Sequence, residues 1–595
     1  MYKLLPILKY LLKRRIAWVS LAAVMLCTTM VLVVISVMGG WLNMFKQSFH
    51  GLTGDIIVRS SSLTGFPYYE EMIDKIGQVE GVAAAVPSIE TFGLLNIGPY
   101  PTSAVRVIGI PIDQIGNVNR FPDSLYRQHI NIQEMLSDPK ISPELRAMLE
   151  EQLKQPPSFA LLDRCGVPLK SMPGDVQLVK EGSGFRVQGS VGKENLPPEL
   201  ASRFWFDAQA GKLMFKGIMA PEDRLLLRGL SEDAQFKHAV DQLFAISNSG
   251  NVIDYQSLVP RTRQDVTKWP GMIVGIGVIG IQRDKAGDWV SELGSRLPLQ
   301  DDPGIYGRPL KLTVLGFHPG ESSPDINNRS ERNYWLVDDS RTQIWQYDNN
   351  YVYVSFKQLQ LDLGMQAQDA TLDTGEKITI PDRTTEIHIR MQPGYTDDAS
   401  LVIARSRIED VVDKVGDEHE GTSVLGTGHP YVETWLESQA VWINAIENEK
   451  MLTVMLFGVI SVVAIFLIFC IFYMIVLEKT RDIGIIKSVG ASSAGVAGIF
   501  LWYGLTIGII GSGLGLLLSY GIVHNINEMH AWLGRQFHIQ IWNPEVYLFD
   551  KIPNQMSAAD IQWIVPIAIF ASVLGALIPA IAAGRQNPVE SLRWE

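Results

Sequence analysis

The chain has 595 residues, of which 47% are apolar and 19% are charged, and its formal net charge is −12. The acidic balance excludes proteins that bind nucleic acid through a strongly basic surface, and the length predicts more than one domain. Four windows contain no Lys, Arg, Asp or Glu, and each supplies the roughly 20 apolar residues that a membrane-spanning helix needs. These windows are Ile16–Phe45, Met451–Leu477, Ser488–Asn527 and Ile561–Gly584.

Basic residues in the short flanks predict the orientation of these four spans, because such residues stay in the cytoplasm. The first apolar window is too long for a cleaved signal peptide, so a retained signal anchor is expected. With four spans, all three basic flanks lie on the same side of the membrane, which is therefore the cytoplasmic side. Segments 46–450 and 524–560 then lie outside the cytoplasm. The flanking residues are Lys3, Lys9, Lys13, Arg14 and Arg15, then Lys479, Arg481 and Lys487, then Arg585 and Arg593.

The large outer segment is predicted to be α/β at both ends, with a helical region inserted between them. Strand patterns such as Ala104–Ile110 and the alternation of Ile387, Ile389 and Met391 occur on both sides of the insertion. Because the two chain ends return to the membrane, the two α/β pieces are expected to pair into one domain. The helical patterns of residues 116–265 indicate no function.

No motif in the sequence predicts a catalytic, cofactor or metal site. The glycine motif Gly275–Gly280 lacks the helix that a dinucleotide site requires after it, which favours a glycine-rich strand edge. No phosphate-binding loop of the Walker type occurs, so any ATP is expected to be bound by another subunit. The three cysteines, Cys27, Cys165 and Cys470, are predicted to be packing residues.

A short charged segment, Leu477–Ser492, lies between the second and third apolar windows. On a helix, Ile483, Ile486 and Gly490 share one face with Val489 beside it. A plain connector on the membrane surface does not need this apolar stripe. We therefore expect an amphipathic helix that a soluble partner binds, with apolar anchors and charges that set the register. The predicted contact residues are Glu478, Arg481, Asp482, Ile483, Ile486 and Val489.

Several segments together resemble FtsX-like (MacB-type) ABC transporter permeases, and in particular the lipoprotein-releasing (LolC/LolE) permeases. "EKTRDIGIIKSVGAS" is similar to their coupling segment, "VETWLESQAVWINAIENEK" to their second stalk and "IFLWYGLTIGIIGSGLGLLLSYG" to their third span. "VISVMGGWLNMFKQSFHGLTGDIIV", "VRVIGIP" and "NPVESLRWE" extend the resemblance to both ends. Residues 116–265 have no counterpart, and "SVMGG" departs from the usual Met-Asn-Gly.

The resemblance implies a fold of four transmembrane helices with a large extracytoplasmic α/β domain, the MacB-like periplasmic core, between helices 1 and 2. It implies a multi-pass protein of the bacterial cytoplasmic (inner) membrane that is not an enzyme and holds no cofactor. ATP would be used by a partner ABC ATPase, whose motion reaches the outer domain by mechanotransmission. A second permease subunit, identical or different, and membrane lipids are further implied partners, with lipoprotein cargo and a periplasmic acceptor as additional candidates.

Release of lipoproteins from the membrane is the function that the resemblance favours. The same family includes efflux permeases for peptides or drugs and regulators of cell-wall hydrolases, and these remain alternatives. A membrane-anchored enzyme or sensor is a third possibility, although no cytoplasmic segment is long enough for a signalling module. The predicted segments are 1–15, 16–45, 46–115, 116–265, 266–434, 435–450 (stalk), 451–477, 478–493 (coupling helix), 494–523, 524–560, 561–584 and 585–595 (tail).

Overall fold

The computed structural model contains two compact units, which are described separately. The helical unit comprises Met1–Gln47, Gln439–Trp542 and Lys551–Glu595, and the α/β unit comprises Ser48–Ser438 and Asn543–Asp550. Most of the predicted N-terminus 1–15 and residues 588–595 of the predicted tail lie outside the described residues. The structure describes residues 15–97, 102–137, 139, 143–159, 165–182, 184–188, 190–191, 194–216, 219, 221–247, 269–283, 289–291, 309–317, 328–371, 377–419, 428–539, 541–549 and 551–587.

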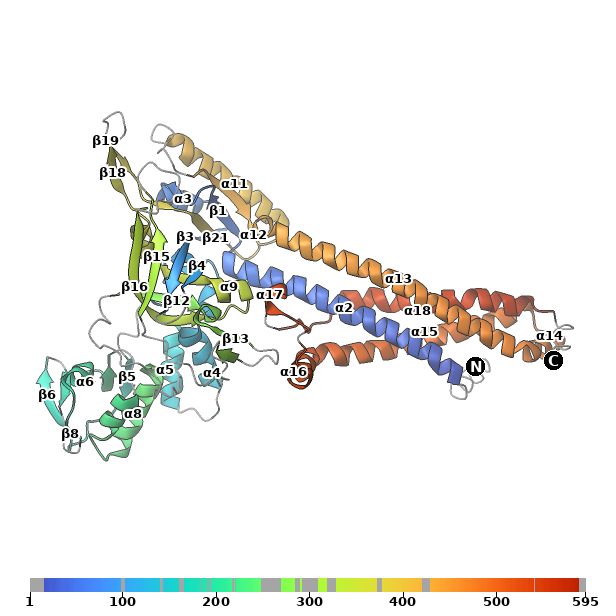
Figure 1. Ribbon diagram of the computed structural model, residues 1–595, viewed down its shortest axis with the longest axis horizontal. Coiled ribbons are helices and arrows are strands. Elements are labelled where there is room, and N and C mark those ends of the chain that lie inside the picture. The colour runs from blue at the N-terminus through green and yellow to red at the C-terminus, as the bar shows by residue number, and fades with distance from the viewer. Residues whose placement is uncertain are drawn as a thin grey trace. The chain divides into compact units, whose positions relative to one another are not determined.

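Long helices that run side by side build the helical unit (Figure 1). Among the described residues, four helices are long and apolar enough to cross a membrane, which confirms the four predicted spans. Three of them extend beyond their charge-free windows, whereas α15 lies within the window Ser488–Asn527. The helices are α2 (Arg15–Thr53), whose last turns belong to the α/β unit, α13 (Ala440–Glu478), α14 (Thr480–Ser488), α15 (Ser493–His524), α16 (Ile526–Phe537) and α18 (Ala558–Arg585).

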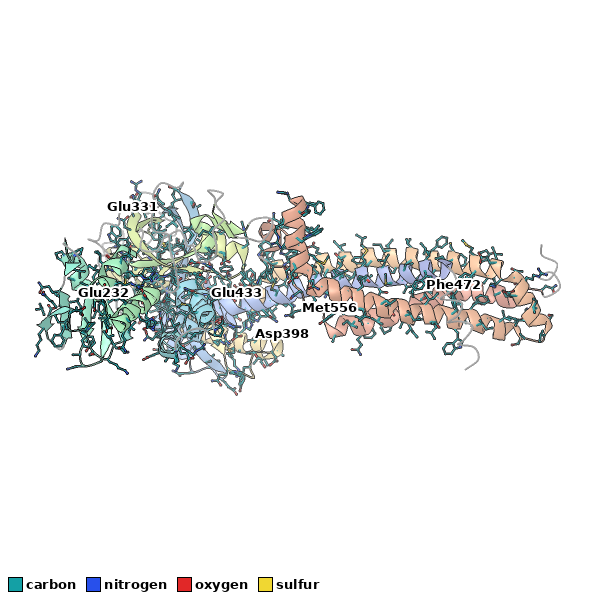
Figure 2. All side chains as sticks on the ribbon, turned by 90° about the horizontal axis from the view of Figure 1, so that it is seen from below. Glu232, Glu331, Asp398, Glu433, Phe472 and Met556 are labelled. Carbon is teal, nitrogen blue, oxygen red and sulfur yellow. The ribbon has the colours of Figure 1, made fainter. Side chains whose placement is uncertain are left out.

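Aromatic and aliphatic side chains from four helices fill the centre of this unit. Phe472 of α13 is fully buried and meets Tyr503 of α15 edge-on, with ring centroids 5.5 Å apart. Figure 2 labels Phe472 within the group of helices. Val24 of α2 and Ala576 of α18 belong to the same buried cluster. Helix α13 therefore contributes its large side chains to the core, while α18 contributes small ones.

Glycines on α15 allow the backbones of neighbouring helices to approach closely. A Cβ on Gly504 would lie 2.7 Å from the Cβ of Ala576, and one on Gly515 would lie 2.8 Å from the carbonyl oxygen of Met25. Gly508 and Gly511 are similarly close to α18 and α2. Nothing lies within 4 Å of a Cβ on Gly513. Small residues at such spacing are typical of packing between membrane helices, so four of these five glycines serve close packing.

Hydroxyl groups on α2 and α18 reinforce these close contacts by forming hydrogen bonds to the backbone of α15. Ser572 Oγ of α18 donates a 3.0 Å hydrogen bond to the carbonyl oxygen of Gly504. Thr29 Oγ1 of α2 lies 3.1 Å from the carbonyl oxygen of Gly515. The close approach that glycine permits thus brings side-chain donors within reach of backbone acceptors, and α15 is fixed to α2 and α18 by both packing and hydrogen bonds.

A mixed nine-stranded sheet forms the centre of the α/β unit, and it interleaves strands from both sides of the insertion. β4 lies between β3 and β17, and β21 lies between β3 and β1, so the two predicted α/β pieces do pair. The strand order is β15 (Pro309–Leu315), β16 (Arg329–Ser340), β12 (Gly271–Gly275), β17 (Tyr351–Ser355), β4 (Ser103–Ile110), β3 (Val82–Asn96), β21 (Glu386–Met391), β1 (Ile56–Ser60) and β22 (Pro430–Thr434).

An additional pairing closes part of this sheet on itself. β15 pairs with the second half of β3 as well as with β16, so the first six strands in the order form a closed barrel. Closure leaves these strands without free edges, which would otherwise pair with other chains. Helices accompany the sheet at several points: α3 (Tyr69–Ile76), α9 (Trp345–Asn350), α10 (Phe356–Asp362), α11 (Asp398–Glu418), α12 (Trp435–Ser438) and α17 (Pro544–Tyr547).

Charged residues link three neighbouring strands at the edge of the sheet. Arg59 of β1 donates from Nε to Glu386 Oε1 at 2.7 Å and from a terminal nitrogen to Glu433 Oε1 at 2.8 Å. Burial raises the pKa of Glu386, but the hydrogen bond from His388 and the charges of Arg59 and His388 outweigh burial and lower it to about 2. Glu386 is therefore held as a carboxylate.

The predicted glycine-rich strand edge at Gly275–Gly280 is present, and its glycines serve packing. β12 ends at Gly275, a short 3₁₀ helix η5 (Ile276–Ile279) follows, and β13 (Ile281–Arg283) begins after Gly280. A Cβ on Gly275 would lie 2.3 Å from the carbonyl oxygen of Asp348. Close approach to α9 explains why glycine occurs there.

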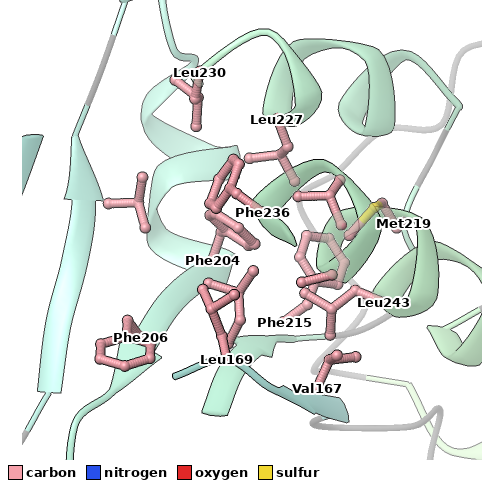
Figure 3. Close-up of a cluster of buried hydrophobic side chains, with 14 of the residues drawn as sticks. Val167, Leu169, Phe204, Phe206, Phe215, Met219, Leu227, Leu230, Phe236 and Leu243 are labelled. Carbon is pink, nitrogen blue, oxygen red and sulfur yellow. The ribbon is translucent and has the colours of Figure 1, made fainter. Parts of the chain in front are cut away.

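The inserted region is a separate layer of sheet and helices, so the prediction that residues 116–265 are helical is wrong for much of their length. Phe204 and Phe206 point into a core that also contains Phe215, Phe236 and Leu243 (Figure 3). Strands of four or five residues are too short to show their alternation against helical patterns nearby. The strands, in sheet order, are β5 (Cys165–Pro168), β11 (Lys212–Phe215), β10 (Phe204–Asp207), β7 (Gly184–Gln188) and β6 (Gln177–Glu181). The helices of the region are α4 (Asn131–Ser137), α5 (Pro143–Leu153), α6 (Pro198–Arg203), α7 (Pro221–Arg228) and α8 (Ala234–Ser247).

The predicted stalk 435–450 is not one continuous helix. α12 ends at Ser438, and Gln439, with φ −102° and ψ 8°, separates it from α13. Within the helical unit, Glu447 of α13 lies 3.5 Å from Lys46 of α2, measured from Oε1 to Nζ. The two helices therefore run side by side at this level.

Candidate functional site

The charged segment between the second and third spans contains α14, which is shorter than the predicted helix 478–493. Glu478 is the last residue of α13, and Lys479 breaks the helix before α14 begins at Thr480. The Thr480 hydroxyl donates to the carbonyl oxygen of Leu477 at 2.9 Å and so satisfies the end of α13. Gly490 ends the segment with φ +108°, a conformation that glycine adopts without strain. Val489 consequently lies just beyond α14.

One face of α14 is buried against the other helices of the unit. Ile483 is only 3% exposed and packs with Val476 of α13, Val496 of α15 and Ala583 of α18. Ile483 is therefore covered by helices of its own chain, and its role as a partner anchor stays a prediction. The residue instead joins α14 to three spanning helices.

Lys487 also holds the buried face of α14 in place, because it binds the C-terminal end of α18. Its Nζ donates to the carbonyl oxygen of Gly584 at 2.9 Å and to that of Gln586 at 2.7 Å. The last carbonyl groups of a helix lack intrahelical donors and carry partial negative charge, so a lysine placed there stabilises the helix end. α14 cannot shift relative to α18 without breaking these bonds.

The opposite face of α14 presents apolar side chains among charges. Ile485 is 49% exposed, Ile486 is 44% exposed and Val489 is 86% exposed. Arg481 and Asp482 are exposed on the same side, and Asp482 pairs with Lys479. We call Ile485, Ile486 and Val489, with Arg481 and Asp482, the exposed face of α14.

Four of the six predicted contact residues belong to this exposed face: Arg481, Asp482, Ile486 and Val489. Glu478 is exposed at the end of α13, and Ile483 is buried. Ile485 also belongs to the exposed face, although the predicted stripe, which contained Ile483 and Ile486, did not include it. Thr480 and Gly484, which are small and buried, share the face of Ile483 and were the signal that this face packs inward.

The fixed end of α2 is a second feature that bears on function, and it lies within the α/β unit. His50 Nε2 lies 2.6 Å from Asp55 Oδ1, and the His50 ring stacks on Trp435 with centroids 4.8 Å apart. Asp55 also accepts a 2.7 Å hydrogen bond from the Met391 backbone. The last turns of α2 are thereby held to β1, β21 and α12.

The family model with which the sequence was compared matches the part of the chain that contains α14. The family model described as FtsX-like permease C-terminal matches residues 454–588, which run from α13 to just beyond α18. LolC, a lipoprotein-releasing system transmembrane protein of Neisseria meningitidis serogroup B, is 29% identical over 165 residues, which are 28% of this chain and 40% of that protein.

Two further relatives are also similar to part of this chain. LolE of Haemophilus influenzae, also a lipoprotein-releasing system transmembrane protein, is 28% identical over 168 residues, 27% of this chain and 39% of that protein. ABC transporter permease YtrF of Bacillus subtilis is 41% identical over 54 residues, 9% of this chain and 12% of that protein. The chain thus spans about 40% of the length of the LolC and LolE relatives. Residues 454–588 are therefore similar to the C-terminal domain of FtsX-like permeases, and this similarity together with the four apolar helices points to a multi-pass protein of the inner membrane.

Proposed function

We propose that this chain is the permease subunit of an ABC transporter that releases lipoproteins from the membrane. A separate ABC ATPase hydrolyses ATP and binds the exposed face of α14, and the chain itself is not an enzyme and holds no cofactor. A second permease subunit, identical or different, completes the transporter. The α/β unit corresponds to the MacB-like periplasmic core outside the cytoplasm, and both termini lie inside.

The two faces of α14 are the observation that carries this proposal. Three apolar side chains, Ile485, Ile486 and Val489, are exposed beside Arg481 and Asp482, while Ile483 and Lys487 fix the opposite face to the helical unit. An interface with apolar anchors and a charged rim has this composition. Because the inner face is fixed, a displacement of the exposed face is transmitted to α13, α15 and α18.

Within the α/β unit, the fixed end of α2 supports the mechanotransmission part of the proposal. The contacts of His50 with Asp55 and Trp435 leave no loose segment between the last turn of α2 and β1. Motion of α2 is then expected to move the sheet rather than to be absorbed locally. The substrate need not pass through the membrane for such motion to do work on it.

Copurification tests the ATPase interface. In Ile486→Asp a carboxylate would be buried without a partner on binding, so the ABC ATPase that copurifies with the wild-type chain should be lost. Ile486→Ala should weaken binding more than Arg481→Ala, since apolar anchors contribute more than rim charges. Ser488→Asp is the matched control, because it adds the same charge beside the exposed face without removing an apolar anchor. Normal ATPase binding and normal stimulated hydrolysis in Ile486→Asp would refute this role of α14.

The cargo requires a separate experiment. Lipoprotein with its acyl chains should copurify with the transporter, and ATP should release it from reconstituted membranes. The names of the LolC and LolE relatives support this cargo, although the match spans less than half of those proteins. Transport of peptides or drugs without bound lipoprotein would favour an efflux permease, and ATP-dependent activation of a cell-wall hydrolase would favour a regulator.

Cysteine labelling in intact cells tests the orientation. A membrane-impermeant reagent should modify a cysteine placed at Glu418, which is exposed, and should leave one at Ser488 unmodified. Labelling at Ser488 from outside would overturn the topology and, with it, the cytoplasmic site for an ATPase.

A further inference from the structure

Helix α16 follows α15 after a single residue, Asn525, and leaves the direction of the spanning helix. It is amphipathic: on a helical projection Met529, Trp532, Leu533 and Phe537 fall on one side, while Glu528 and Arg535 fall on another. Figure 1 shows α16 turned across the direction of α15. No function assigned above uses this helix.

One face of α16 is fixed to the chain that leads to α18. Asn527 Nδ2 donates to the carbonyl oxygen of Ile552 at 2.9 Å, and Asn527 Oδ1 accepts from the Ile552 backbone at the same distance. The Trp542 backbone donates to His530 Nε2 at 3.3 Å. Trp542 in turn meets Trp41 of α2 edge-on, with centroids 6.3 Å apart.

These contacts place α16 at a defined level along the spanning helices. Pro553, which follows Ile552, is so close to α2 that a Cβ on Gly40 would lie 2.7 Å from it. At the neighbouring Gly39, a Cβ would lie 3.7 Å from both Lys450 Nζ and Asp560 Oδ2. Lys450 and Asp560 are the first charged residues beyond the charge-free windows of α13 and α18.

The antiparallel packing of α15 against α18 shows which residues of α15 lie at the level of Asp560. Gly508 lies against Ser572 and Gly504 lies against Ala576, so the two helices run antiparallel in step. Tyr520 is twelve residues beyond Gly508, and Asp560 is twelve residues before Ser572, so these two residues lie at a similar height. Tyr520 and Trp563 are both exposed there. Aromatic side chains with a polar group gather where hydrocarbon meets lipid headgroups, which identifies this level as the membrane surface.

The outward side of α16 is apolar and exposed at this level. Trp532 is 55% exposed and Phe537 is 56% exposed, and their rings meet edge-on at 5.7 Å. Met529 is also exposed, as are Ile539 and Ile541 just beyond the helix. A helix of this composition, aligned with a membrane surface, gains free energy by burying its apolar side among headgroups and the first part of the acyl chains.

We propose that α16 is an interfacial helix whose partner is the bilayer surface itself, with Met529, Trp532 and Phe537 inserted into the headgroup region. It anchors the connection between α15 and α18 at the end of the helical unit that carries Lys450 and Asp560. A second copy of the chain or a soluble protein on this face is the competing occupant.

Lipid-borne quenchers distinguish these occupants in the whole chain. Cys27, Cys165 and Cys470 are replaced by serine, and single cysteines at Met529, Trp532 or Arg535 carry the fluorophore NBD. The proteins are reconstituted in nanodiscs of phosphatidylethanolamine and phosphatidylglycerol, with or without phosphatidylcholine bearing a doxyl group at carbon 5. The 5-doxyl lipid should quench the labels at Met529 and Trp532, and aqueous iodide should preferentially quench the label at Arg535.

Two results would overturn the proposal. Equal iodide quenching at all three positions would mean that α16 stands in water. Protection of Met529 and Trp532 from both iodide and the doxyl lipid would mean that protein covers the face. The midpoint of thermal unfolding of each labelled protein reports whether it retains its fold.

Discussion

Gly504 and Ala576 form a close contact between α15 and α18, since a Cβ on Gly504 would lie 2.7 Å from the Cβ of Ala576. The Ser572 hydroxyl reaches the Gly504 carbonyl oxygen beside it. A glycine that had served bending would leave space around its Cα, whereas this position has none. The third span is thus held by contact rather than hinged at Gly504.

Gly504→Ala is expected to destabilise the helical unit by about 1–3 kcal/mol, because an added methyl group forces α15 and α18 apart. Gly513→Ala is the matched control, since the same substitution on the same helix meets nothing within 4 Å. Thermal unfolding in detergent micelles measures both. Equal midpoints for the two variants would contradict the close packing at Gly504.

Ile483→Ala should lower stability by about 2–4 kcal/mol, because it removes a buried side chain from the contact among α13, α14, α15 and α18. Ile485→Ala, which truncates an exposed neighbour, should leave the midpoint of thermal unfolding nearly unchanged. Because the ATPase is proposed to bind the exposed face of α14, Ile485→Ala should reduce copurification of the ATPase without lowering stability. A stable Ile483→Ala variant that loses only the ATPase would instead support Ile483 as a contact residue.

Lys487→Met is expected to cost about 2 kcal/mol, since it removes charge-assisted hydrogen bonds to the carbonyl oxygens of Gly584 and Gln586. Arg481→Met removes an exposed cation from the same helix and should have little effect on unfolding. Cross-linking between cysteines at Ser488 and Gln586 would report the loosening of α14 from α18. An unchanged melt and unchanged cross-linking in Lys487→Met would show that these bonds contribute nothing.

Glu386 should make the α/β unit sensitive to acid. Its pKa in the folded chain is lowered from 4.5 to about 2, so its contribution to stability is complete above pH 4.5 and is lost as the pH falls toward 2. Glu386→Gln should therefore flatten the dependence of unfolding on pH over this range. Glu449→Gln, an exposed residue of α13, is the control. A wild-type melt that does not change between pH 5 and pH 2 would contradict the role of Arg59 and His388.

Phe236→Ala should unfold the inserted layer without disturbing the helical unit. Phe236 is fully buried, and truncation of such a side chain costs about 3–5 kcal/mol. Val179→Ala, at an exposed position of β6, is the control. Limited proteolysis with mass spectrometry should find new cleavage within residues 165–247 of Phe236→Ala and none between α13 and α18. New cleavage throughout the chain would show that the insertion does not fold as a separate layer.

Patterns that repeat within a short window were predictable from the sequence alone. The four charge-free windows predicted the spanning helices, because the length needed to cross hydrocarbon depends only on local composition. The alternation of Ile387, Ile389 and Met391 predicted the strand β21, and all three side chains are buried. The charged segment before the third span was located correctly for the same reason.

The tertiary structure alone decided which faces of these elements are free. Ile483 and Ile486 look alike in sequence, but only the arrival of Val496 and Ala583 from distant helices buries Ile483. The pairing of β4 with β17 joins residues more than 200 positions apart, and closure of the barrel depends on β15 returning to β3. The short strands of the insertion were hidden because their pairing, not their local pattern, stabilises them. Local periodicity thus determined the elements, and long-range contacts determined which of their residues are available to a partner.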